Sequence, residues 1–81
     1  MVLIFTDLQG AIPMFERIVR VPGILCGKPT IRGTRISVEF VMELFESGGT
    51  PELIVERYPH LTLEDINQAI QFAQAGNDLR P

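Results

Sequence analysis

Three pairs of helix start and stop signals constrain the fold of this chain more than any other feature. A serine or threonine of the kind that caps helix N-termini precedes three runs of helical apolar spacing, at Ser37, Thr50 and Thr62. Each run ends at a residue that stops a helix, namely Gly48, Pro59 and Gly76. The sequence therefore predicts helices near 38–47, 51–58 and 63–75, with boundaries good to a few residues.

The first of these helices is expected to lie at the centre of the domain. Its apolar arc covers about 200°, which is wider than the stripe of an ordinary surface helix. The arc is formed by Val38, Phe40, Val41, Met42, Leu44 and Phe45. Hydrophobic residues make up 46% of only 81 residues, which is more than one small core needs. We therefore expect a homodimer, with residues 2–5 as an exposed strand edge where two copies exchange contacts.

The part of the chain before Ser37 has an extended pattern. Pro22-Gly23 predicts a turn, and residues 31–36 read as a short strand with a glycine bulge or turn at Gly33. The expected fold class is mainly α: a homeodomain-like three-helix bundle with a helix-turn-helix and a short N-terminal β extension or hairpin. Residues 1–15 form an N-terminal extension, 16–76 form the single domain and 77–81 form a tail.

Charge is divided unevenly along a chain whose net charge is −3. Residues 1–36 hold five basic and two acidic residues, whereas residues 37–81 hold two basic and eight acidic ones. The two parts therefore carry +3 and −6. This asymmetry indicates a polar partner for each part, or neutralisation of one part by the other in a dimer. The single cysteine, Cys26, fits a reducing cytoplasm, and no apolar run approaches the roughly 18 residues of a membrane span.

The second and third helices and the turn between them form a helix-turn-helix candidate. The expected exposed face of the third helix carries amide side chains, which can pair with adenine in a major groove: Asn67, Gln68, Gln71 and Gln74. Glu64 and Asp65 at the start of the same helix would repel phosphate. A solvated polar face on a helical bundle explains the same pattern, and from the helix alone we favour that interpretation.

Basic side chains before the first helix are better candidates for phosphate contact. The segment 27–36, GKPTIRGTRI, contains Lys28, Arg32 and Arg35 beside two glycines. Arg32 is expected to face solvent when Ile31 faces the core. For Arg35, an ion pair with a helix carboxylate such as Glu56 is at least as good an interpretation as a DNA contact.

The remaining reactive residues predict little chemistry. Cys26 and the only histidine, His60, have no further ligands nearby in sequence, so we expect neither a metal site nor a cysteine nucleophile. No catalytic motif and no cofactor motif is present, which favours a binding module over an enzyme. Phe72 lies off the apolar arc of its helix. It is a candidate anchor for a protein partner, and packing against the N-terminal segment is an equal alternative.

Residues 17–75 resemble a small prokaryotic family, the domains of unknown function numbered 433. The resemblance rests on Gly-Lys-Pro, Gly-Thr-Arg, Pro-Glu and Tyr-Pro-x-Leu-Thr motifs, which lie at Gly27, Lys28, Pro29, Gly33, Thr34, Arg35, Pro51, Glu52, Tyr58, Pro59, Leu61 and Thr62, together with the apolar Ile31. Residues 1–15 fall outside the family pattern, and Cys26 stands where the family often has glycine.

The resemblance implies the antitoxin half of a type II toxin–antitoxin pair. Its partner would be a PIN-like ribonuclease toxin, and antitoxins of this kind commonly bind their own operator DNA. We therefore expect a DNA-binding antitoxin and autoregulator. The alternative is a protein-interaction module that neutralises the toxin without touching DNA, which the net negative charge favours.

Overall fold

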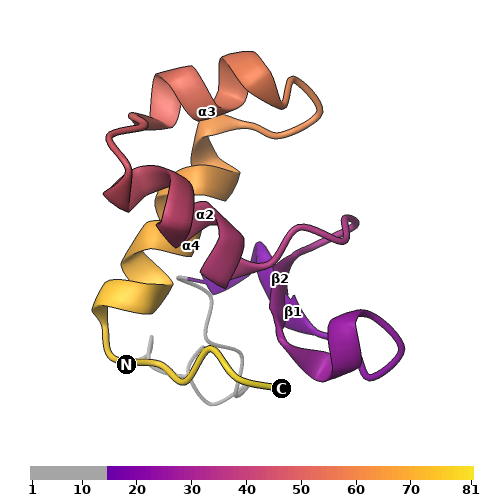
Figure 1. Ribbon diagram of the computed structural model, residues 1–81. Helices are drawn as coiled ribbons and strands as arrows, with labels where there is room; N and C mark the ends of the chain where they lie inside the picture. Colours follow the sequence, from indigo (N-terminus) through magenta and orange to yellow (C-terminus); the bar gives the residue numbers. More distant parts are fainter. Residues whose placement is uncertain (1–14) are drawn as a thin grey trace, which may run out of the picture.

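The structure, a computed structural model of the chain, describes residues 15–81. A two-stranded hairpin precedes three helices (Figure 1). The elements are β1 (Ile18–Arg20), the 3₁₀ turn η2 (Leu25–Gly27), β2 (Pro29–Ile31), α2 (Val38–Glu46), α3 (Pro51–Arg57) and α4 (Leu63–Gln74). The mainly helical class with a short hairpin is confirmed. The homeodomain-like relationship stays a prediction, and the strand predicted at residues 2–5 lies outside the described residues.

All three predicted helix starts form as expected. Each capping hydroxyl accepts a hydrogen bond from the backbone N–H three residues later, at distances from 2.9 to 3.2 Å. The pairs are Ser37 with Phe40, Thr50 with Leu53, and Thr62 with Asp65. The helices end within one residue of the predicted positions, because the stop signals are equally local.

Glycine ends α2 for a conformational reason. Gly48 has a φ of 102°, in the region that side chains other than glycine rarely adopt. The next N–H, of Gly49, then donates to the carbonyl of Leu44 at 2.9 Å and closes the helix. This sharp reversal brings α3 back across one end of α2 and α4 (Figure 1).

The core lies where α2 packs on α4, with α3 and β2 completing it. Its buried apolar side chains come from all four of these elements and from the turn before α4: Ile31, Val38, Val41, Ile54, Leu61, Ile66, Ala69 and Ile70. The wide apolar arc of α2 is therefore only partly covered. Val38 and Val41 are fully buried, whereas Phe40 is 37% exposed and packs edge-on against Tyr58.

The hairpin forms because a tight turn joins β1 to η2. Ile24 N–H donates to the Val21 carbonyl at 2.8 Å around the predicted Pro22-Gly23 turn. The strands then pair antiparallel, with Ile18 opposite Ile31. The strand predicted over 31–36 is shorter than expected, since β2 ends at Ile31 and the chain turns at Gly33.

The C-terminal tail is attached to the hairpin. The Arg20 guanidinium donates to the backbone carbonyls of Gly27, Asp78 and Arg80, and Leu79 packs against the core. Figure 1 shows the tail running from the end of α4 back below the hairpin. Residues 77–81 contain no helix or strand, as predicted for a tail, yet they are part of the packed domain.

Cys26 occupies a backbone conformation that suits glycine. Its φ is 59° and its ψ is 27°, which is the left-handed region. That conformation costs a residue with a side chain roughly 1–2 kcal/mol, and glycine much less. The glycine that the resembling family often has at this position therefore has a physical reason.

We predict that Cys26→Gly raises the free energy of unfolding by about 0.5–1 kcal/mol, measured by urea denaturation. The gain is smaller than the conformational cost because glycine also gains freedom in the unfolded chain. Cys26→Ser is the matched control, since it removes the exposed thiol and keeps the strained backbone. A stability of Cys26→Gly equal to or below that of Cys26→Ser would contradict this account.

Candidate functional site

The turn that follows β2 is short and held by several hydrogen bonds; we call residues 32–35 the basic turn. Ile31 N–H donates to the Ile36 carbonyl at 2.9 Å, and the Thr34 hydroxyl donates to the Ile31 carbonyl at 2.8 Å. The same hydroxyl oxygen accepts from Ile36 N–H at 3.0 Å. The turn therefore presents Arg32 and Arg35 from a fixed backbone.

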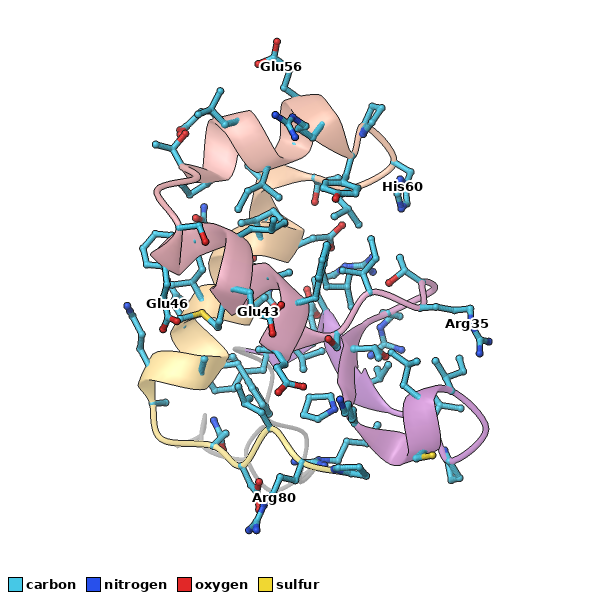
Figure 2. The ribbon with its side chains drawn as sticks, in the orientation of Figure 1. Arg35, Glu43, Glu46, Glu56, His60 and Arg80 are labelled. Atoms are coloured by element: carbon cyan, nitrogen blue, oxygen red, sulfur yellow. The ribbon has the colours of Figure 1, made fainter. Side chains whose placement is uncertain are left out.

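Arg35 projects away from the domain at the tip of this turn (Figure 2). The predicted ion pair between Arg35 and Glu56 is wrong, because Figure 2 places Glu56 on α3, far from Arg35, and the ion pairs among residues 15–81 do not include it. Arg35 is therefore a cation available to a partner.

Arg32 is exposed and keeps its charge. Its Nε and Nη2 donate to the Glu16 backbone carbonyl at 2.9 and 2.7 Å. A carbonyl carries no net charge, so it orients the guanidinium without neutralising it. The expected solvent-facing position of Arg32 is confirmed.

Lys28 is neutralised within the chain. Its Nζ lies 2.8 Å from Glu39 Oε1 at the start of α2. The hydrogen bond to Glu39, together with that carboxylate's charge, raises the pKa of Lys28 above its usual value. Lys28 remains exposed enough to reach a phosphate, but doing so would require breaking this pair.

One member of the predicted amide face of α4 is buried. Gln68 is only 5% exposed; its Oε1 accepts from Arg17 N–H at 2.8 Å and its Nε2 donates to Glu64 at 2.6 Å. The expected solvent exposure of Gln68 is therefore wrong. The physical reason is that this side of α4 faces β1, so an amide here must satisfy the backbone of the incoming strand. Asn67 and Gln71 are exposed as predicted.

Sequence reasoning missed Arg17, which joins β1 to the start of α4. Arg17 Nε donates to Asp65 Oδ1 at 2.6 Å, and the Asp65 side chain is only 3% exposed. Asp65 Oδ2 also accepts from Thr62 N–H at 3.0 Å, completing a capping box. Asp65 therefore carries a charge compensated inside the fold and is not available to repel an approaching phosphate.

The balance of these contacts sets the ionisation of Asp65. Burial alone raises the pKa of Asp65, but the hydrogen bonds from Arg17 and Thr62 and the charge of Arg17 outweigh it. The net effect holds the pKa below its ordinary value of 3.8. Asp65 thus stabilises the fold at neutral pH, and that contribution is lost as pH falls through the lowered pKa.

Phe72 packs within the domain. Its ring meets the ring of Phe15 edge-on, with centroids 5.4 Å apart, and the side chain is half-buried. Packing against the N-terminal segment, one of the two alternatives drawn from the sequence, is therefore observed. A role for Phe72 in partner binding stays a prediction.

Two surface hollows accompany these residues. The first, which we call the apolar hollow, lies between α2 and α3, has a volume of about 530 Å³ and is lined mainly by Leu44, Leu53, Ile54 and Tyr58. The second, the acidic hollow, has a volume of about 550 Å³ and lies between α2, α4 and the tail. Within residues 15–81 no three histidine, cysteine or acidic side chains gather as metal ligands do, and no helix there is long and apolar enough to cross a membrane.

We predict that Arg17→Met lowers the free energy of unfolding by about 2 kcal/mol at pH 7, because it leaves the Asp65 carboxylate buried without its partner. Fully buried pairs lose roughly 3–5 kcal/mol, and Arg17 is partly solvated. Asp65→Asn should flatten the loss of stability that the native protein shows as pH falls below about 4. Urea denaturation from pH 2.5 to 7 measures both effects. Lys28→Met, which breaks an exposed pair, is the control and should change little. Parallel pH curves for Asp65→Asn and the native chain would refute the assignment.

Comparisons with known proteins agree with this geometry. The crystal structure of a DUF433 member protein from Anabaena variabilis superimposes with a TM-score of 0.70 at 27% sequence identity, covering 91% of this chain and 73% of that chain. An uncharacterized protein of Sinorhizobium fredii, y4eO, is 38% identical over 65 residues. Those residues are 80% of this chain and 29% of that protein, so the chain spans less than a third of that relative. A family model described as protein of unknown function (DUF433) matches residues 18–73. This chain therefore belongs to the DUF433 family.

Proposed function

We propose that this domain is the antitoxin of a type II toxin–antitoxin pair, a non-enzymatic cytoplasmic module that binds a PIN-like ribonuclease. The family resemblance supplies the class of partner. The apolar hollow between α2 and α3 is the observation that supports protein binding most directly. Toxin neutralisation needs a surface that can bury against another protein, and this hollow is lined by apolar side chains close to open solvent.

Leu53 is the central residue of the proposed interface. It is 52% exposed, the largest exposed fraction among the big apolar side chains of residues 15–81 for which exposure is given. Leu44, Ile54 and Tyr58 lie beside it in the hollow, and Glu56 and Arg57 form a polar rim. An apolar centre within a charged rim is the usual anatomy of a protein interface.

Electrostatics favour protein binding as the primary activity. Lys28 is paired with Glu39, Gln68 is buried, and residues 37–81 carry a net charge of −6. Sequence-independent affinity for DNA scales with the number of phosphates that a protein neutralises. Few free cations therefore give weak DNA binding from a single copy.

Autoregulation through operator DNA is the second candidate, and the basic turn is the observation that favours it. Arg32 and Arg35 are exposed and carry their full charge. α3 and α4 are joined by a short turn, as in a homeodomain-like helix-turn-helix, and Asn67 and Gln71 lie on the exposed side of α4. In this arrangement the arginines would contact phosphates and the amides would read bases.

We predict that the domain restores growth when it is co-expressed with a PIN-like ribonuclease encoded next to it. Leu53→Asp should abolish that rescue, because a carboxylate cannot be buried unpaired at an apolar interface. Val21→Asp is the matched control, since Val21 is also an exposed apolar residue but lies on the hairpin. Both variants should keep the native circular dichroism spectrum. Full rescue by Leu53→Asp would rule out this surface, and absence of rescue by the native chain would rule out the antitoxin function.

For operator binding, Arg32→Ala together with Arg35→Ala should weaken binding to all DNA sequences alike and reduce the slope of log affinity against log salt by about 2. Gln71→Ala should instead relax sequence preference, and Lys28→Ala should have a smaller effect than either arginine. Gel shifts with the protein's own promoter at several salt concentrations measure all three. If the native chain shows no salt-sensitive shift, the domain binds protein only.

A further inference from the structure

The acidic hollow has an apolar floor and a negatively charged rim. Met42, Phe45, Ala73 and Leu79 lie at its floor, contributed by α2, α4 and the tail. Glu39, Glu43 and Glu46 form its rim and follow helical spacing along one side of α2. A side chain with an apolar stem and a cationic head matches this combination of surfaces.

Two of the rim carboxylates have no cation of their own. Among residues 15–81 the ion pairs are Arg17 with Asp65, Lys28 with Glu39 and Arg80 with Asp78. Glu43 and Glu46 belong to none of these, and both are exposed on the visible side of α2 in Figure 2. Like charges four residues apart or less on a helix repel each other, so an external cation here would stabilise both.

Lys28 already shows how a basic side chain meets this rim. Its ammonium lies 2.8 Å from Glu39 Oε1, and the carboxylate raises the pKa of Lys28. One end of the acidic hollow is therefore covered by a cation from the hairpin, and the remaining two carboxylates continue the same row.

The chain itself carries matching cations on a different part of its surface. The basic turn presents Arg32 and Arg35, and Arg35 projects into solvent. In Figure 2 Arg35 lies at one side of the domain and Glu46 at the other, with Glu43 between them. A twofold axis in front of α2 exchanges these two sides, so each copy would meet its partner twice in equivalent contacts.

We propose that the chain forms a homodimer in which the basic turn of each copy docks on the acidic hollow of the other. Arg35 approaches Glu43 and Glu46 while its aliphatic stem covers the apolar floor, and Arg32 adds a second charge. The charge division between residues 1–36 and 37–81, +3 against −6, is then neutralised between copies. This dimer does not depend on the antitoxin function, because neither the basic turn nor the acidic hollow includes the Leu53 surface.

Charge exchange tests the proposal. The native chain is expected to be dimeric by light scattering and sedimentation in 50 mM salt, and to dissociate progressively as salt is raised. Arg32→Glu with Arg35→Glu gives one variant, and Glu43→Lys with Glu46→Lys gives another. Each alone should weaken dimerisation by roughly tenfold or more, since attraction becomes repulsion at both contacts. Glu52→Lys with Glu56→Lys, two exposed glutamates on α3, is the control with the same charge change and should dimerise like the native chain.

Mixing the two reversed variants is the decisive step. The negative turn of one then faces the positive hollow of the other, and the positive turn of the second faces the negative hollow of the first. The equimolar mixture should therefore form a heterodimer although neither variant dimerises alone, and a chain carrying all four substitutions should dimerise by itself. Arg35→Glu alone keeps the contacts of Arg32 with Glu16, so it separates a lost interface from a disturbed hairpin. A 9 kDa particle for the native chain, native dimers from both reversed variants, or a mixture that stays monomeric would each overturn the proposal.

Discussion

The contact between Arg17 and Asp65 determines how the two parts of this domain fit together. A buried carboxylate is costly unless a charge and hydrogen bonds compensate it. Asp65 receives both: Arg17 binds one oxygen, and the N–H of Thr62 binds the other. The same side chain therefore completes the capping box of α4 and fixes the first residues of the hairpin. Because Arg32 N–H donates to the Arg17 carbonyl at 2.7 Å, the position of the basic turn follows from this contact as well.

The helices could be predicted from sequence because their signals are local. Ser37, Thr50 and Thr62 each need only the backbone N–H three residues later, so the residue type and its place before an apolar run contain the information. The site was predicted less completely. Arg17 and Asp65 are 48 residues apart, and Arg17 N–H and Gln68 are 51 apart, so no spacing motif announces either contact. Gln68 looked like part of an exposed amide face because helical periodicity does not say which element packs on it.

The candidate surfaces lie in different parts of the molecule. α3, which lines the apolar hollow, lies at one end, and the hairpin with its basic turn lies toward the other (Figure 1). Their chemistry differs in the same way: Leu53 offers apolar area, whereas Arg32 and Arg35 offer charge from a rigid turn. A protein partner at the apolar hollow would therefore leave the basic turn free for DNA or for a second copy of the chain. This separation allows an antitoxin to neutralise its toxin and regulate its own operator at the same time.

The most direct measurement of the central claim, that the apolar hollow receives the protein partner, is an NMR titration. Isotope-labelled domain is titrated with the ribonuclease encoded beside it, and backbone amide shifts are followed for residues 15–81. The account predicts the largest changes at Leu44, Leu53, Ile54 and Tyr58, with little change at Asn67 and Gln71. Changes concentrated instead on the basic turn and α4, with the hollow unaffected, would contradict it.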